Sequence, residues 1–174
     1  MSRVTSALMS ICPSVEELID RSVSRKEIEF VVGKFLAAFT LVLTGLIVTL
    51  IHFITLTQVG TNIDYGAIFT GYLGLAFAGA LYSAVGTFAS GVTDNQVISF
   101  IIGIFIVLIF FLMDKMLMFI PMSLTGLIQY LSVDYHLSNI SRGVIDTRNV
   151  VYFISVIGFF LFITVQVLNI RKWR

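Results

Sequence analysis

An apolar run from Phe35 to Thr57 is interrupted by one ionisable side chain, His52. As a helix rising 1.5 Å per residue, this run is long enough to cross the roughly 30 Å hydrocarbon core of a bilayer. Three further apolar runs follow it, at 66–90, 97–113 and 150–169. Only 12% of the 174 residues are charged, whereas about 25% are charged in a soluble chain. The sequence therefore predicts an all-α, polytopic bundle of four membrane-spanning helices.

The second run, 66–90, differs from the others because it is rich in small residues. Lipid supplies no hydrophobic drive for helix association, so spans associate where small side chains let their backbones approach closely. We expect this helix to lie in the middle of the bundle. Its predicted helix-packing residues are Ala76, Gly79, Ala80, Ser83 and Ala84.

Two short polar connections separate the first three runs. Asp64 precedes the second run and is a candidate N-cap for its helix. The segment Thr93–Gln96 has the spacing of a capping box before the third run. Both features predict sharp helix starts.

The polar segment 14–34 contains two helix-start signatures, in which a serine precedes a glutamate by three residues: Ser14 with Glu17, and Ser24 with Glu27. We therefore expect a short amphipathic helix, a turn at 21–23, and a second helix that enters the membrane from Ser24. The first helix would carry Val15, Leu18 and Ile19 on one side and Glu16, Glu17 and Asp20 on the other. Residues 1–13 show no convincing period and are left unassigned.

The connection between the third and fourth runs, 116–146, is too interrupted to form another span. Pro121 breaks the apolar pattern, and the stretch Ser123–Val133 is too short to cross a bilayer. We interpret it as an interfacial or re-entrant helix, which is tolerated only where protein or water satisfies its backbone. Asp114 and Lys115, just before it, are expected at the outer boundary of the membrane.

The distribution of lysine and arginine predicts the orientation of the chain. Five cations precede the first run and three follow the last, whereas only Lys115, Arg142 and Arg148 lie between runs. By the positive-inside rule both termini are cytoplasmic. Segment 14–34 is then cytoplasmic, 35–174 forms the transmembrane domain, and 116–146 lies outside.

Motifs for catalysis or metal binding are missing from the sequence. It has no phosphate loop, no Gly-x-Ser-x-Gly element and, with two histidines and one cysteine, no cluster of metal ligands. We therefore expect no enzyme, no metal and no cofactor in this chain, and a net charge of +1 gives no reason to expect a nucleic-acid partner. His52 is a candidate transport-pathway residue because ionisable groups inside spans are often functional. The alternative is a histidine that reaches interfacial water at the outer end of its helix.

Three stretches, in this order along the chain, resemble the membrane subunit of bacterial export-class (type 2) ABC transporters, in the gliding-motility permease branch. They are Val23–Ile28 with Gly33–Ala38, Asp64–Leu75 with Thr93–Val97, and Ser141–Asp146 with Asn149–Phe153. The resemblance covers about 14–174. It departs from the family in two ways: the first two of six spans have no counterpart here, and Ser22 stands where the family usually has proline.

The resemblance implies a permease subunit in a bacterial inner membrane that pairs with a second permease, identical or different. Two cytoplasmic ATPase subunits would bind the ATP and drive export. The family's coupling helix corresponds to Ser14–Arg21, which makes Val15, Glu16, Glu17, Leu18, Ile19 and Asp20 the expected ATPase contacts. The alternative is a four-helix membrane scaffold without transport activity, whose cytoplasmic segment recruits a partner.

Overall fold

The computed structural model describes residues 13–59, 64–116, 126, 129–143 and 146–172, with side chains from Arg25 onward except at 56–57, 59, 114 and 171–172. Within these ranges the regular structure is entirely helical. The elements are α2 (Pro13–Val59), α3 (Tyr65–Val92), α4 (Gln96–Met116), α6 (Val133–Ser141) and α7 (Thr147–Lys172). Four of them are long and apolar enough to cross a membrane, over Arg25–Thr55, Tyr65–Val92, Gln96–Met113 and Thr147–Ile170. The chain is a multi-pass helical membrane protein.

Helix α3 occupies the centre, where its small residues predict it. It packs against α2, α4, α6 and α7 and contributes most of the buried residues of the core, among them Leu81 and Val85. Two glycines of α3 show how closely its neighbours pack against it. A Cβ at Gly74 would lie 2.9 Å from Leu137 Cδ1 of α6, and a Cβ at Gly79 would overlap Val42 Cγ1 of α2. Side chains of α6 and α2 therefore lie so close to α3 at these two positions that a larger residue would not fit.

Helix α2 is a single helix of 47 residues, about 70 Å long at 1.5 Å per residue. The turn predicted at 21–23 is wrong, because the helix continues through these positions. No glycine or proline lies between Ser14 and Gly33, so nothing in the sequence interrupts the ladder of backbone hydrogen bonds. The serine and glutamate at 24 and 27 match a capping pattern but lie inside the helix.

The predicted helix starts after the two polar connections are real, with one change of residue. Asp64 caps α3, its carboxylate accepting from the backbone N–H groups of Gly66 and Ala67 at 3.0 and 3.3 Å. At the start of α4, Asn95 takes the capping position expected of Thr93, and its side-chain oxygen accepts from Val97 N at 3.0 Å. Thr93 instead braces the turn by accepting from Asn95 N at 3.2 Å.

The short helix before the last span begins where the sequence analysis expected it to end. Helix α6 runs from Val133 to Ser141, with Ser132 as N-cap accepting from Tyr135 N at 3.3 Å. Within the stretch 123–133, positions 123–125 and 127–128 lie outside the described residues. The turn into α7 passes through Gly143, whose φ of 89° is a conformation that favours glycine.

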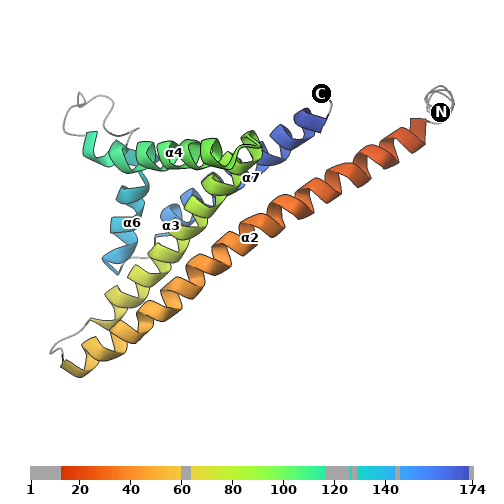
Figure 1. The fold of residues 1–174 in the computed structure, drawn as a ribbon. Helices are drawn as coiled ribbons and strands as arrows, with labels where there is room; N and C mark the ends of the chain where they lie inside the picture. Colours follow the sequence, from red (N-terminus) through yellow and green to blue (C-terminus); the bar gives the residue numbers. More distant parts are fainter. Residues whose placement is uncertain (1–12, 60–63, 117–125, 127–128, 144–145, 173–174) are drawn as a thin grey trace.

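The long helices do not share one direction. In Figure 1, α3 and α7 run beside α2, while α4 crosses them at a steep angle. The described start of α2 and the end of α7 point toward the same end of the molecule. Two ends that lie on the same side are what an even number of membrane crossings produces.

Candidate functional site

The first candidate site is the N-terminal extension of α2. Residues 13–24 precede the candidate span Arg25–Thr55 on the same helix, and they add about 18 Å at 1.5 Å per residue. The six expected ATPase contacts, Val15 to Asp20, lie on this extension, but their side chains lie outside the described part of the chain. The structure thus places the segment on an uninterrupted helix without showing its contacts.

The face of α2 that packs on the bundle is marked by Val31, which is 1% exposed. It lines a small cavity together with Thr87, Gly91 and Thr164, and α2 packs against both α3 and α7. One turn along, the Lys34 ammonium donates to Ser90 Oγ and lies 5.9 Å from the centroid of the Phe30 ring. These contacts fix the rotation of α2 about its axis at the end where the extension begins.

The predicted helix-packing residues follow the centre of α3. Ala80, Ser83 and Ala84 are buried, and Gly79 lies beneath Val42 of α2. Ala76 is half-buried and lines a hollow between α2 and α3. The small side chains thus lie where α3 meets its neighbours.

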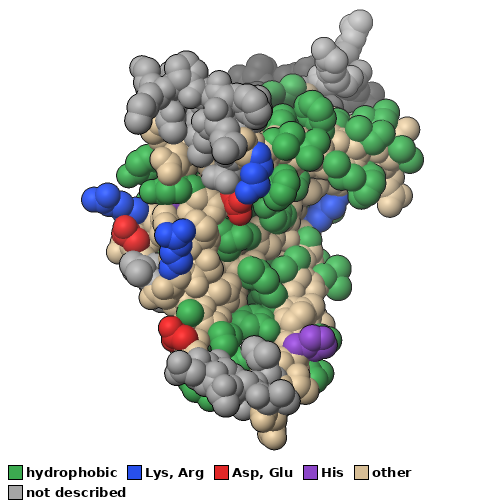
Figure 2. Space-filling view, turned by 90° about the vertical axis from the view of Figure 1, so that its left-hand side faces the viewer, with side chains coloured by type: hydrophobic (Ala, Val, Ile, Leu, Met, Phe, Trp, Pro, Cys, Tyr) green, Lys and Arg blue, Asp and Glu red, His purple; other side chains and the backbone are tan. Residues whose placement is uncertain are grey.

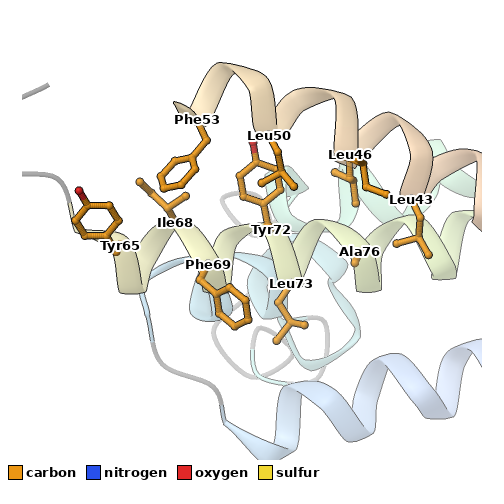
Figure 3. Close-up of a pocket in the computed structure, with 11 residues that line it drawn as sticks. Leu43, Leu46, Leu50, Phe53, Tyr65, Ile68, Phe69, Tyr72, Leu73 and Ala76 are labelled. Atoms are coloured by element: carbon orange, nitrogen blue, oxygen red, sulfur yellow. The ribbon is translucent and has the colours of Figure 1, made fainter. Parts of the chain in front are cut away.

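The hollow beside Ala76 has a volume of about 500 Å³ and lies between the last turns of α2 and the first turns of α3 (Figure 3). Leucines of α2 and aromatic rings of α3 line it. The Tyr72 hydroxyl, a polar group in this lining, donates to the Thr49 carbonyl at 3.1 Å and so has a hydrogen-bond partner. Such a lining suits hydrocarbon and offers nothing for catalysis.

His52 is exposed on α2 and lines none of the hollows described for the structure. Its backbone carbonyl accepts from Thr55 Oγ1 at 2.8 Å, while no described side chain hydrogen-bonds its imidazole. The structure does not bring His52 together with the other polar groups singled out here.

A buried polar cluster centred on His136 was not predicted. The His136 ring is 2% exposed, and its Nδ1 and Nε2 lie 2.8 Å from Asn149 Oδ1 and 3.0 Å from the Tyr130 carbonyl oxygen. The ring stacks on Tyr152 with centroids 4.0 Å apart, and the Tyr152 hydroxyl donates to the Leu131 carbonyl at 2.6 Å. The cluster fastens α6 and the residues before it to the first turns of α7.

Sequence reasoning missed this cluster because its members come from separate segments that only the folded chain brings together. The signal that could have indicated it is the helical spacing of two polar residues on either side of the Gly143 turn. Val133 lies three residues before His136, and Phe153 lies four residues after Asn149. Each polar residue therefore shares a helix face with an apolar residue that the structure buries. Polar groups in such a setting are normally hydrogen-bonded.

An ion pair joins the last turn of α4 to the first turn of α6. Lys115 Nζ lies 3.2 Å from Asp134 Oδ2, and the two side chains are 57% and 38% exposed. The expectation that Lys115 lies at the outer boundary of the membrane stays a prediction.

Comparison with protein-family models, curated proteins and solved structures finds no match to this chain. The described residues also hold no group of three or more histidine, cysteine, aspartate or glutamate side chains that could bind a metal ion. The class that the fold defines is a multi-pass helical membrane protein. Its function has to be inferred from α2, the α3 core and the polar groups around α6.

Proposed function

We propose that the chain is a permease subunit of an export-class ABC transporter, driven by a separate cytoplasmic ATPase through the extension of α2. The observation that carries the proposal is the unbroken helix from Pro13 to Val59. Because residues 13–24 and the candidate span Arg25–Thr55 belong to one helix, a force applied at 13–24 moves the span directly. A flexible linker would absorb the same force.

The register of α2 supports the extension as a docking element. At 3.6 residues per turn, position 18 lies about 140° around the helix from position 31. Position 31 belongs to the face covered by α3 and α7. The apolar positions 15, 18 and 19 therefore belong to a face turned away from this bundle, as a face that binds a partner would be.

The composition of the extension supports a protein partner over the lipid surface. Amphipathic helices that bind protein grooves present apolar anchors with a polar rim, and here the rim is acidic: Glu16, Glu17 and Asp20. An anionic cytoplasmic leaflet attracts basic segments, not acidic ones. An acidic rim instead favours a basic protein cleft.

The proposal includes a second permease subunit, a bacterial inner membrane and cytoplasmic termini. The exposed apolar side chains of α2 and α4 support a further helical subunit or lipid around the bundle; they include Leu41, Ile47, Phe100 and Phe105. ATP would be bound by the ATPase subunit, and this chain would contribute part of the pathway through the membrane.

The second candidate function is a membrane scaffold that recruits a partner without transport. In that case the extension of α2 would bind the recruited partner. An ATPase with a phosphate loop encoded beside the gene of this chain favours the transporter, and the lack of one favours the scaffold.

The test is co-purification of that ATPase with the Leu18→Asp variant. A charge placed in a docking groove is expected to remove about 2 kcal/mol or more of binding free energy, about 30-fold in Kd. Ser24→Asp is the matched control, because position 24 lies within about 20° of position 31 in register and so on the other face of the helix. Undiminished recovery with Leu18→Asp, in a complex that the parent chain forms, rules out this face as the coupling element.

Site-specific photo-crosslinking separates docking of the extension on the ATPase from its resting on the membrane surface. A photoreactive residue at position 18 should capture the ATPase, and one at position 24 should not. Capture of lipid alone at position 18 would show that the extension rests on the membrane surface.

A further inference from the structure

A second hollow lies between α2 and α3, which pack side by side (Figure 1). Its volume is about 550 Å³, and its lining includes Lys34, Ala38 and Leu41 of α2 and Tyr82, Gly86 and Thr87 of α3. We call this feature the Lys34 groove, which distinguishes it from the hollow beside Ala76. A volume of this size is within the range of small-molecule sites in proteins.

The Lys34 groove begins near one end of the α3 span and extends toward the middle of that span. Lys34 hydrogen-bonds Ser90, which lies two residues before the end of α3 at Val92. At the inner end of the groove, Leu41 lies about 10 Å from Lys34 along α2, at 1.5 Å per residue. Because the candidate span also ends at Val92, the ammonium lies close to the membrane boundary and the rest of the groove lies within the apolar layer.

The inner part of the groove is open toward lipid. Leu41 is 75% exposed, and a Cβ at Gly86 would meet no atom within 4 Å. Ser83, which also lines the groove, is 7% exposed, and its hydroxyl has no hydrogen-bond partner among the described residues. The Thr87 hydroxyl differs, because it donates to the Ser83 carbonyl at 2.8 Å. This part of the groove therefore offers space for a hydrocarbon chain together with an unused hydroxyl donor.

The charge of Lys34 is not balanced by an anion within the described part of the chain. Its ammonium donates to Ser90 Oγ and lies 5.9 Å from the centroid of the Phe30 ring, and no described carboxylate pairs with it. An ammonium has three N–H donors, so two remain after the contact with Ser90. Cations are also sparse on this molecule, since Figure 2 shows few charged side chains on a largely hydrophobic surface.

The position of the ammonium favours a ligand and not only water. A lysine at a membrane boundary usually extends its ammonium into water, whereas the bond to Ser90 holds the Lys34 ammonium against α3 at the mouth of the groove. Basic pockets between membrane helices bind anionic lipid headgroups. A cation at the boundary, followed by an apolar groove, is complementary to an amphiphile with an anionic head.

We propose that the Lys34 groove binds an anionic glycerophospholipid of the adjacent leaflet. The lipid phosphate accepts from the Lys34 ammonium, an ester carbonyl accepts from the Ser83 hydroxyl, and one acyl chain lies over Gly86 toward Leu41. The missing side chain at Gly86 leaves room for this chain. The site depends on the packing of α2 against α3 and not on the proposed coupling to an ATPase.

The test uses the full chain in nanodiscs with photoactivatable phosphatidylglycerol and, in parallel, photoactivatable phosphatidylcholine, each with the reactive group on an acyl chain. The expected result is several-fold stronger labelling of the α2 and α3 peptides around Leu41 and Gly86 by the anionic lipid. Equal labelling by the two lipids would overturn the proposal.

A charge variant tests whether Lys34 selects the lipid. Lys34→Gln removes the charge but keeps a donor for Ser90, and it should abolish the preference for phosphatidylglycerol. Lys26→Gln is the matched control, because it removes the same charge from an exposed position of α2 about 12 Å away along the helix; it should leave the preference unchanged. A preference that survives in Lys34→Gln, or that is lost equally in Lys26→Gln, would contradict binding at the groove.

A filling variant tests the place of the acyl chain. A Cβ added at Gly86 meets no atom within 4 Å, so Gly86→Leu is compatible with the helix packing and fills part of the groove. It should reduce labelling around Leu41 several-fold, while Gly158→Leu, at an equally open site on α7, should leave it unchanged. Undiminished labelling in Gly86→Leu would contradict the proposal. So would an unlabelled groove in the parent chain together with a shift from dimer to monomer in Gly86→Leu, because the occupant would then be a second copy of the chain.

Discussion

At the scale of single residues, the two histidines of the chain have opposite surroundings. His52 attracts attention in the sequence because it interrupts an apolar run, yet the structure leaves it exposed without a described side-chain partner. His136 is unremarkable in the sequence and is buried between Asn149, the Tyr130 carbonyl and the Tyr152 ring. A polar residue inside an apolar run is visible from local sequence. Burial that depends on residues from another helix is not.

This difference predicts that removal of the His136 imidazole lowers the unfolding free energy more than removal of the His52 imidazole. His136→Leu leaves Asn149 and the Tyr130 carbonyl without their partner, and a buried polar group without a hydrogen bond costs about 1–3 kcal/mol. His52→Leu should change the unfolding free energy by less than about 0.5 kcal/mol, as surface substitutions usually do. Denaturation of both variants in the same detergent measures this. Equal stability losses would show that the cluster around His136 contributes no more than an exposed side chain.

Gly79 gives a second residue-scale prediction. Gly79→Leu introduces a side chain where even a Cβ overlaps Val42 Cγ1, and overpacking of this kind costs on the order of 1–3 kcal/mol. The measurement is the thermal stability of the purified protein in detergent. Gly86→Leu, on the same helix but facing open space, is the control and should unfold close to the parent. If Gly79→Leu also matches the parent, the contact between α2 and α3 is looser than described.

At the scale of elements, the long helices could be predicted because the length and hydropathy of an apolar run are local properties. The beginnings and ends of shorter elements could not be predicted in the same way. The serine at 24 fits a cap, yet α2 continues through it, because a capping pattern starts a helix only where the preceding backbone is not already helical. Helix α6 begins at Val133, where tertiary burial of Val133, His136 and Ile140 decides its position.

The continuity of α2 predicts that a break between extension and span uncouples the two. Val23→Pro removes one backbone donor and clashes with the preceding turn, which destabilises a helix interior by about 3 kcal/mol. We expect this variant to insert in the membrane and still bind the proposed ATPase, but to lose its effect on ATP hydrolysis. Val23→Ala preserves the helix and is the matched control. Parental ATPase rates with Val23→Pro would show that force does not pass along α2.

At the scale of the whole molecule, the sequence predicts four spans, and the structure contains four helices long and apolar enough to cross a membrane. The central place of α3 also follows from its small residues, since close approach in lipid depends on them. The steep crossing of α4 could not be predicted. It depends on how α4 packs against α3 and α6, which no local pattern indicates.

The central claim is that the chain crosses the membrane four times, with the extension of α2 on the cytoplasmic side and the α6–α7 turn outside. Single cysteines at Ser22 and Ser141, in a Cys12→Ser background, test it by labelling with a membrane-impermeant maleimide. Ser141 is exposed at the end of α6, and Ser22 lies on the extension. The account predicts labelling of position 141 in intact cells and of position 22 only after the membrane is permeabilised. Labelling of both positions from the same side would contradict it.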